Sequence, residues 1–452
     1  MDILKSFINA IKSFINAVKV KDIRRKLLFT LLMLLIVRVG CQIPVPGINQ
    51  DVIAQFMSGL FGTDGIGIFG AFTGGSFENM SILALNITPY ITSSIIIQLM
   101  TIAIPKLEEM QNDGEDGRKK LAAITRYVTV ALALIESAAM AIGFGNQYVG
   151  GQRLLTDFNA LSVITVIAAM TAGSAFLMWI GERITEKGVG NGISIVLIIN
   201  IISSFPSDAK TLFEQFVKNK TVAVGVLNAV LIILIVLVLV VMVIFLSDGT
   251  RKVPLQYAKK VQGNKMMGGN NSVIPIKINT AGVIPVIFAS SILQFPIIIS
   301  SMVGYSGTGW WGEVLKYLNA KYWFNTSNFL YTVGVIAYIA MIVFFAYFYT
   351  SITFNPIEIA NNLKKSGGFV PGIRPGKPTS EYLNSVLNYI IFIGAIGLTC
   401  VAVFPYIFTG LFGASISFGG TSIIIVVGVI IETVKQIEAQ MLVRNYKGFL
   451  NN

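Results

Sequence analysis

The sequence predicts an all-α polytopic membrane protein with ten transmembrane helices, arranged as two inverted halves of five helices, with a short re-entrant helix between the first two spans. Three observations lead to this prediction: the composition, the spacing of the apolar runs and the placement of the cations. Charged residues make up 12% of the 452-residue chain and hydrophobic residues 54%, whereas soluble proteins carry about 25% charged residues. The chain has too few polar side chains to cover a water-facing surface.

The spans are predicted from runs of about 20 apolar residues, the length that crosses the hydrocarbon core of a bilayer. They lie at 24–43, 80–104, 121–144, 160–180, 190–206, 222–246, 280–302, 329–351, 383–404 and 417–436. An even number of crossings places both termini on the same side of the membrane.

Lysine and arginine are distributed unequally between the two sets of connections. Of the 34 cations, 27 lie in the two termini and the loops on the same side, and six lie in the loops on the other side. Cytoplasmic segments carry an excess of Lys and Arg, so we expect both termini in the cytoplasm. The remaining cation, Arg38, lies inside the first span.

The two ends of the chain are predicted to be cytoplasmic segments, an amphipathic arm at 1–22 and a tail at 441–452. The arm contains a duplicated seven-residue sequence, Lys5–Ile11 followed by Lys12–Val18. It leads directly into the first span without a small-residue cleavage pattern, so we do not expect a cleaved signal. On a helix the duplication forms one apolar face, which suits either the anionic membrane surface or packing on the protein's own cytoplasmic side.

An inverted repeat is predicted from two irregular spans, and it divides the chain into an N-terminal half (23–206) and a C-terminal half (207–440). Gln98 follows Pro89 by nine positions, and Gln294 follows Pro285 by nine. These segments are five spans apart and therefore cross the bilayer in opposite senses, as inverted repeats require. Chance similarity between two apolar helices is the alternative.

The connection after the first span contains seven glycines among apolar residues at 59–75. It is too short to span the membrane and too apolar for an ordinary exposed loop. Irregular backbone at membrane depth is tolerated where protein or a watery cavity receives it. We therefore expect a short re-entrant helix at about 60–75, with an interfacial loop as the alternative.

Several kinds of chemistry are excluded or disfavoured by missing residues. The chain has no histidine and only two cysteines, Cys41 and Cys400, both within apolar runs. It has no glycine-rich phosphate loop followed by Lys and Ser or Thr. Two isolated carboxylates, Glu136 and Glu432, are too few to favour a proton-coupled carrier. We therefore predict no enzyme activity, no cofactor and no metal site, and an energy source outside the chain.

Two long cytoplasmic loops, 247–279 and 352–382, are predicted to form a docking surface. Glycine and proline surround Arg374 and preset turns that hold it at a defined tip. An acidic protein face and RNA phosphate are the partners that basic loops favour. The basic residues are Arg251, Lys252, Lys259, Lys260, Lys265, Lys277, Lys364, Lys365, Arg374 and Lys377.

A family resemblance covers nearly the whole chain beyond the arm. The run from Phe354 to Gly376, with its Asn-Asn-Leu-Lys-Lys-Ser-Gly-Gly and Pro-Gly-Ile-Arg-Pro-Gly segments, closely resembles the bacterial SecY family, the central subunits of protein-translocation channels. Further motifs that resemble the family are Ile43–Gly47, Pro89–Ile91, Gly190–Ser194, Tyr257–Lys260 and Gly419–Ser422.

The resemblance implies an hourglass pore between the halves, through which unfolded polypeptides cross the plasma membrane. A lateral gate between helices 2 and 7 would release transmembrane segments into the bilayer. The implied pore ring is Ile87, Ile91, Leu197, Ile287 and Ile425, where Leu197 departs from the isoleucine of some relatives. The implied plug, which closes the pore from outside, is the glycine-rich segment with Phe61, Ile66, Ile68, Phe69 and Phe72. The residues assigned to the gate are Thr92, Ser93, Gln98, Ser290, Ser291 and Gln294.

The resemblance also implies partners. They are the small membrane subunits SecE and SecG, the SecA ATPase, the ribosome, unfolded proteins that carry signal sequences, and the lipid bilayer. Docking to SecA or the ribosome would fall to Arg251 and Arg374, with Lys259, Lys260, Lys364 and Lys365 secondary; any single lysine there could instead serve only membrane topology. The competing hypotheses are an inverted-repeat secondary transporter of a small solute and an intramembrane protease.

Overall fold

The computed structural model describes twelve stretches of the chain. They are residues 19–50, 52–53, 73–145, 148–149, 152–218, 221–257, 260–262, 265–267, 271–302, 309–324, 329–412 and 420–450. The predicted plug residues Phe61, Ile66, Ile68, Phe69 and Phe72, the docking residue Lys259 and the duplicated arm lie outside the described residues.

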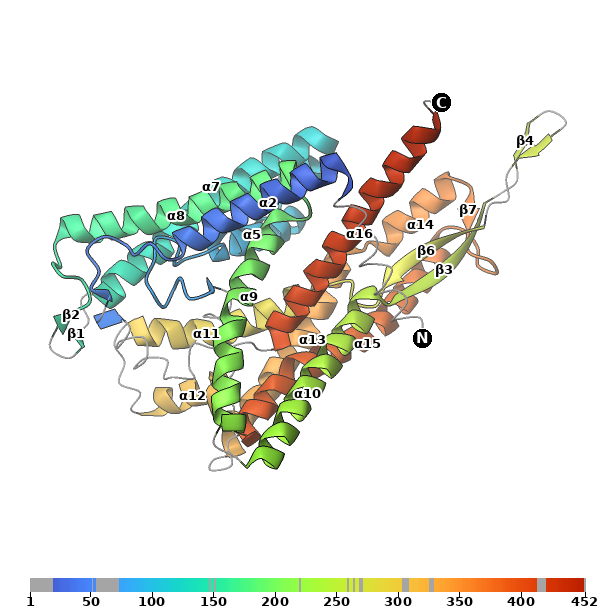
Figure 1. Cartoon of the computed structure of the whole chain (residues 1–452). Coiled ribbons are helices and arrows are strands. Elements are labelled where there is room, and N and C mark those ends of the chain that lie inside the picture. The colour runs from blue at the N-terminus through green and yellow to red at the C-terminus, as the bar shows by residue number, and fades with distance from the viewer. Residues whose placement is uncertain are drawn as a thin grey trace. The chain divides into compact units, whose positions relative to one another are not determined.

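Helices dominate the described residues (Figure 1). The helices up to the end of the fifth predicted span are α2 (Lys21–Gly40), α5 (Thr88–Ala103), α6 (Pro105–Asn112), α7 (Gly114–Gly145), α8 (Ala160–Lys187), α9 (Gly192–Phe213) and the π-helix η1 (Glu214–Lys218). The helices after it are α10 (Val222–Asp248), α11 (Ile284–Met302), α12 (Trp310–Leu318), η2 (Ala320–Tyr322), η3 (Phe329–Thr332), α13 (Val333–Thr353), α14 (Pro356–Lys365), α15 (Lys377–Phe412) and α16 (Gly420–Leu450).

The predicted membrane architecture is confirmed. Each of the ten predicted spans contains a described helix, and among the described residues seven helices are long and apolar enough to cross a membrane. An eighth crossing is formed if α5 and α6, which meet at an angle of 108°, are counted as one broken span. The other two predicted spans correspond to α2, which has 20 residues, and to the short apolar helix α11.

The second span begins later than predicted. Residues 80–87 form turns rather than helix, and α5 starts at Thr88, immediately before Pro89. Proline fits the first turn of a helix because the missing N–H would have no intrahelical partner there. Met80 and Asn86 have positive φ angles of 42° and 52°, which breaks any helix that would run through them.

The seventh span resembles the second in local structure. Helix α11 starts at Ile284, again one residue before a proline, so Gln98 and Gln294 each lie ten positions after the first residue of their helix. This equivalence supports the predicted inverted repeat, although the repeat itself stays a prediction. One difference is Pro296, which lies inside α11 and has no counterpart in α5.

Strands were not predicted, and the structure adds a small sheet that joins the two long loops predicted to be cytoplasmic. Strand β3 (Thr250–Tyr257) pairs antiparallel with β6 (Asn271–Lys277) and with β7 (Gly368–Phe369), in the order β6-β3-β7. Two short hairpins complete the described strands, β1 (Tyr148–Val149) with β2 (Gln152–Arg153) and β4 (Lys260–Gln262) with β5 (Lys265–Met267). Strands β3, β6 and β7 therefore connect the described parts of the loops 247–279 and 352–382.

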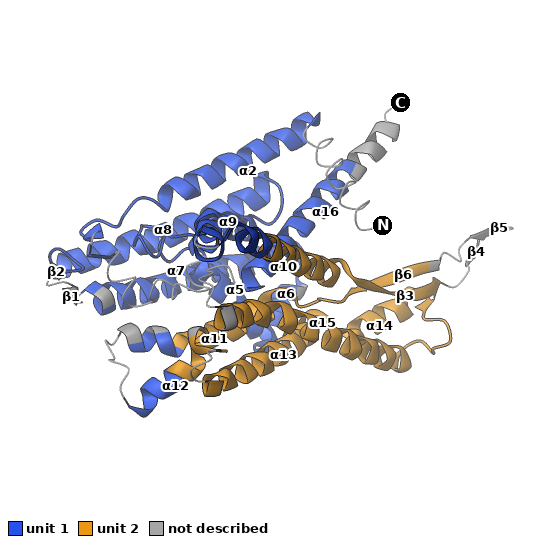
Figure 2. Ribbon diagram, turned by 60° about the horizontal axis from the view of Figure 1, so that its bottom comes forward, with its two compact units in different colours: residues 1–229, 296–315, 413–452 blue, residues 230–295, 316–412 orange. Residues whose placement is uncertain are grey.

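The chain forms two compact units, shown in blue and orange in Figure 2. Unit 1 comprises residues 1–229, 296–315 and 413–452, and unit 2 comprises residues 230–295 and 316–412. In unit 1, α5 packs on α7, α7 on α8, α8 on α9 and α9 on α16. In unit 2, α13 and α14 pack on α15. The predicted boundary at 206/207 was drawn between the two halves of the inverted repeat, and it does not coincide with the division into these units. It stays a prediction.

Candidate pore lining and docking surface

Three of the five predicted ring residues lie together in unit 1. Ile87 at the start of α5, Ile91 one turn later and Leu197 on α9 belong to a single apolar cluster built from α2, α5, α8 and α9. Ile87 is only 1% exposed. Ile425 is buried on α16, which packs on α9, and Ile287 lies on α11 in unit 2. The complete ring stays a prediction.

Residues 73–87, which we call the strap, connect the predicted plug to α5. The strap is almost entirely buried, and its hydroxyl groups are satisfied internally. Ser76 Oγ donates to the carbonyl oxygens of Thr73 (2.8 Å) and Leu83 (3.2 Å), and Ser81 Oγ accepts from the Leu83 N–H at 3.3 Å. Buried backbone without regular structure needs such partners, so the strap has a defined shape.

The start of the strap is attached to two helices. Arg38 Nη1 on α2 donates to the Gly74 carbonyl oxygen at 3.2 Å, so the one cation predicted inside a span has a structural partner. Gly74 has a φ of +59°, and a Cβ atom there would lie 2.8 Å from the Asn200 carbonyl oxygen on α9. Only glycine fits this position, because any side chain would meet backbone.

The end of the strap is held by asparagines. Asn86 Oδ1 accepts from the Ile87 N–H (2.8 Å) and from Asn200 Nδ2 (3.1 Å), and Ser174 Oγ on α8 donates to the Asn86 carbonyl oxygen (3.1 Å). Asn86 tolerates its positive φ because its short polar side chain bonds locally. The sequence analysis missed both asparagines; the signal was a polar Asn200 within the apolar run of span 5.

The strap also contains a carboxylate, Glu78, whose surroundings disfavour its negative charge. Burial raises the pKa of Glu78, and the nearby charge of Asp208 on α9 raises it further. Both effects disfavour the ionised carboxylate. Glu78 is therefore a group whose charge opposes the folded arrangement of the strap.

The predicted gate residues on α5 point in different directions. Thr92 is exposed, and Gln98 is half-buried. Ser93 is fully buried, and its hydroxyl bonds to α7, at 2.5 Å from Thr129 Oγ1 and 3.2 Å from the Thr125 carbonyl oxygen. Ser93 therefore joins α5 to α7 within unit 1. Its assignment to a lateral gate stays a prediction, and Thr92 is the exposed residue of this turn.

The predicted gate residues on α11 are described in unit 2. Ser290 is buried and its hydroxyl donates to the Ile287 carbonyl oxygen of its own helix at 3.0 Å. Ser291 is exposed and Gln294 is half-buried. Their assignment to a gate also stays a prediction.

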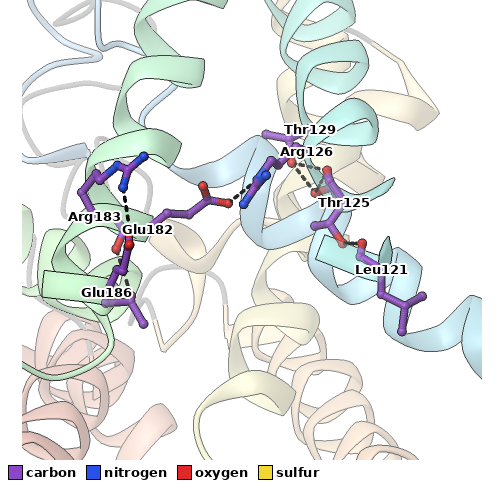
Figure 3. A network of polar contacts seen from close by, with 10 residues as sticks. Leu121, Thr125, Arg126, Thr129, Glu182, Arg183 and Glu186 are labelled. Carbon is purple, nitrogen blue, oxygen red and sulfur yellow. Dashed lines mark hydrogen bonds and ion pairs between the residues drawn. The ribbon is translucent and has the colours of Figure 1, made fainter. Parts of the chain in front are cut away.

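A polar network connects α7 and α8 (Figure 3). Arg126 on α7 donates to Glu182 Oε1 on α8 at 2.7 Å, and Arg183 pairs with Glu186 at 2.6 Å. The Arg183 guanidinium also lies 5.7 Å from the ring centroid of Trp179. The sequence analysis did not single out these residues, although Arg183 and Glu186 have the i,i+3 spacing of a helical ion pair.

The predicted docking surface rests on a buried apolar core like that of a soluble protein. Val253 and Leu255 alternate with exposed residues along β3, so their side chains share the buried face of the sheet. They pack with Ile276 of β6 and with residues of α14 and α15, including Leu363 and Leu383. This core fixes the two loops on the ends of the helices of unit 2.

The predicted docking cations lie mostly on the outside of this core. Arg251, Lys364, Lys365 and Arg374 are exposed, and Lys260 begins β4. Arg374 follows a turn in which the Ile373 N–H donates to the Val370 carbonyl oxygen at 3.0 Å. Gly372 and Gly376, with φ angles of 81° and 100°, flank it, and Thr379 Oγ1 donates to the Arg374 carbonyl oxygen at 2.8 Å. The backbone of Arg374 is thus fixed while its side chain is free to reach a partner.

Comparisons with known proteins identify relatives of the whole chain. The SecY family model matches residues 81–434. The protein translocase subunit SecY of Streptomyces galbus is 43% identical over 438 residues, covering 95% of this chain and 97% of the relative. The solved structure described as "The plug domain of the SecY protein stablizes the closed state of the translocation channel and maintains a membrane seal" matches with a TM-score of 0.61 at 18% identity, covering 93% of this chain and 92% of that one. Sec61 in the canine ribosome-channel complex from the endoplasmic reticulum matches with a TM-score of 0.56 at 16% identity, covering 93% of each chain.

Proposed function

The chain belongs to the SecY family of protein-translocation channel subunits, and from this premise we propose how its residues conduct a polypeptide. It is a multi-pass membrane protein of the translocon. We propose that unfolded polypeptides cross the bilayer through a constriction lined by Ile87, Ile91, Leu197, Ile287 and Ile425. The observation that carries this proposal is the single apolar cluster that Ile87, Ile91 and Leu197 share.

An aliphatic constriction suits a conduit that must also stop ions. A narrow apolar ring dewets and opposes ion passage, while flexible aliphatic side chains can move apart around a chain of any sequence. The channel itself would catalyse no reaction, and the energy would come from its partners. A secondary transporter of small solutes is not favoured, since the relatives that cover the chain are protein translocases.

The ordered cytoplasmic sheet supports a docking role. The exposed cations Arg251, Lys364, Lys365 and Arg374, together with Lys259 and Lys260, would hold the SecA ATPase or the ribosome at the pore mouth. The structure of the canine relative is that of a ribosome-channel complex. Arg374 is the favoured contact, because a guanidinium on a fixed backbone loses little entropy when it binds. SecE and SecG would complete the complex within the membrane.

The same proposal includes the orientation of the chain in the membrane, the plug and the lateral gate. Both termini would lie in the cytoplasm of a bacterial cell and the spans in its plasma membrane, as the 27 cations on one side indicate. The glycine-rich segment at about 60–75 would close the pore from outside. Transmembrane segments would leave between the second and seventh predicted spans, which contain α5 and α11, beside the exposed residues Thr92 and Ser291.

Reconstitution tests the function directly. The purified complex of this chain with its SecE and SecG subunits would be placed in liposomes with SecA, ATP and an unfolded precursor that carries a signal sequence. We expect precursor that is protected from added protease, and no protection when ATP is omitted. Absence of protection under conditions in which an established translocase complex works would refute the proposal.

A further inference from the structure

Both ends of the strap meet the same residue of α9. Near its start, Gly74 packs so closely that a Cβ atom would lie 2.8 Å from the Asn200 carbonyl oxygen and 2.9 Å from Asn200 Cα. At its end, Asn86 Oδ1 accepts a hydrogen bond from Asn200 Nδ2 at 3.1 Å. Asn200 is fully buried and Asn86 is 1% exposed. Asn200 therefore closes the strap into a loop.

This pair of asparagines adjoins the predicted pore ring on both helices. Asn86 directly precedes Ile87, and its Oδ1 also accepts from the Ile87 N–H at 2.8 Å. Leu197 lies three positions before Asn200 on α9, a spacing that puts the two on neighbouring positions of one helix face. Any movement between Asn86 and Asn200 is thus transmitted to Ile87 and Leu197.

Apolar packing alone does not fix this register. Ile87, Ile91 and Leu197 would find equally apolar surroundings in several rotations of their helices, because lipid and protein interiors differ little in polarity. A buried amide pair is more selective, since each side chain left without its partner loses a hydrogen bond that water does not replace.

We propose that the Asn86–Asn200 pair is a clasp that positions Ile87 and Leu197 in the resting channel and so sets its seal against ions. The inference rests on the proposed function, because it assigns the clasp to a ring whose role is itself proposed. Asn86 and Asn200 are positioning residues that act through their neighbours and do not touch the polypeptide.

Resting ion conductance of the purified complex in planar bilayers, with no precursor present, tests the clasp. Asn200→Ala removes the amide, so Asn86 Oδ1 loses the hydrogen bond from Asn200 Nδ2. Asn86→Gly suits the φ of +52° and leaves Asn200 without its acceptor. Each single change removes one buried hydrogen bond between the strap and α9 and is expected to raise resting conductance about fivefold, because that loss shifts the balance between sealed and leaking arrangements by about this factor. The double variant Asn86→Gly/Asn200→Ala removes both partners and is expected to leak less than the product of the two single effects.

A matched control separates positioning from general loss of stability. Ser137 Oγ lies 2.9 Å from Thr171 Oγ1 between α7 and α8, and Ser137 is as fully buried as Asn200. Ser137→Ala therefore removes a buried polar contact of unit 1 that does not adjoin the ring. It is expected to lower the melting temperature as the asparagine variants do, but to leave resting conductance at the wild-type level.

The outcomes distinguish the two proposals. If the wild-type complex exports precursor and the asparagine variants leak no more than Ser137→Ala, the clasp is overturned and the channel stands. Strictly multiplicative effects of the two single variants would also overturn it, because the side chains would then act independently. If the wild-type complex neither exports precursor nor conducts ions when precursor is added, the proposed function fails instead. Should Asn200→Ala fail to assemble, the comparison of Asn86→Gly with Ser137→Ala decides the question.

Discussion

The strap and the β6-β3-β7 sheet are both non-helical parts of a helical protein, and they are stabilised in different ways. The strap buries polar groups, such as Ser76 and Asn86, and satisfies them with hydrogen bonds to itself and to neighbouring helices. The sheet buries apolar residues, such as Val253 and Leu255, and leaves its cations exposed. Where side chains are exposed to water, the hydrophobic effect selects which of them are buried. Among apolar helices it distinguishes poorly between arrangements, so polar contacts must do so.

The largest effect is expected on the exposed side of the sheet. Charge reversal in Arg374→Glu should abolish SecA-driven transport while the protein still inserts and keeps its stability. Losing one charged contact at an interface costs about 2–5 kcal/mol, which lowers affinity by at least about 30-fold. Protease-protected precursor measures transport. Lys119→Glu makes the same charge change on an exposed residue of α7, outside the two loops, that lies near Glu115 and Asp116, and this variant should transport normally. Wild-type transport by Arg374→Glu would remove the docking assignment.

A change in the core of the sheet tests whether burial holds it. Val253→Ala removes two buried methyl groups and should destabilise the sheet by about 2 kcal/mol. Limited proteolysis of loops 247–279 and 352–382 measures the loss, together with reduced transport. Val273→Ala is the same substitution on the paired strand β6, where the side chain is 48% exposed. Equal proteolysis of the two variants would show that the apolar core does not organise the loops.

The apolar cluster beside the strap, which contains Ile87 and Ile91, offers the corresponding test of burial among the helices. Serine in place of Ile87, Ile91 and Ile287 should raise resting ion conductance, because each change removes apolar burial worth about 1.5–3 kcal/mol and lets water enter the constriction. Single-channel recording without precursor measures the leak. An equal triple change at the exposed residues Ile135, Ile142 and Ile164 serves as the control. A conductance unchanged from wild type would count against the ring.

The charge on the strap should be mildly unfavourable. Burial and Asp208 raise the pKa of Glu78, so the folded state binds the proton more tightly than the unfolded state, and stability increases as pH falls through the raised pKa. Glu78→Gln should raise the melting temperature at pH 7 by about 1–3 °C, with a gain that shrinks toward acid pH. The exposed Glu109→Gln should change little. A lower melting temperature for Glu78→Gln would reverse the interpretation.

The smallest effect is expected for the exposed network between α7 and α8. The Arg126 and Glu182 side chains are 50% and 28% exposed, and pairs of this kind contribute about 0.2–1 kcal/mol. Arg126→Ala should lower stability by that amount at low salt and by less at high salt, as thermal unfolding at two ionic strengths would measure. Arg183→Ala, which breaks a pair within α8 alone, should have a smaller effect on the contact between the helices. A salt-independent loss would point to packing rather than charge.

Much of the helical fold could be predicted from the sequence, because the length of apolar runs and the placement of cations are local signals. The start of α5 was missed by several residues because apolar content alone does not distinguish Met80–Ile87 from helix; the positive φ angles of Met80 and Asn86 do. The pairing of β3 with β7 was missed since it depends on residues far apart in the chain. The alternation of Val253, Leu255 and Tyr257 was the available signal for β3.

The candidate site divides in the same way. Residue type and setting sufficed for the turns around Arg374, because the flanking Gly372 and Gly376 adopt positive φ angles; the docking role of Arg374 stays a prediction. Composition gave no direction for Ser93, which turns toward α7 because Thr125 and Thr129 offer hydrogen-bond partners there. Asn86 and Asn200 are 114 positions apart, so no local pattern connects them.

The long separation between β3 and β7 determines when the channel becomes usable during its own synthesis. Tyr257 pairs with Gly368, 111 positions later, so ribosomal synthesis must pass through α11 and α13 before the third strand exists. Domains are completed in the order in which their segments emerge. An unfinished chain therefore lacks a complete docking sheet and offers no finished platform to a partner. A chain that ends before Gly368 therefore cannot form the pairing of β3 with β7.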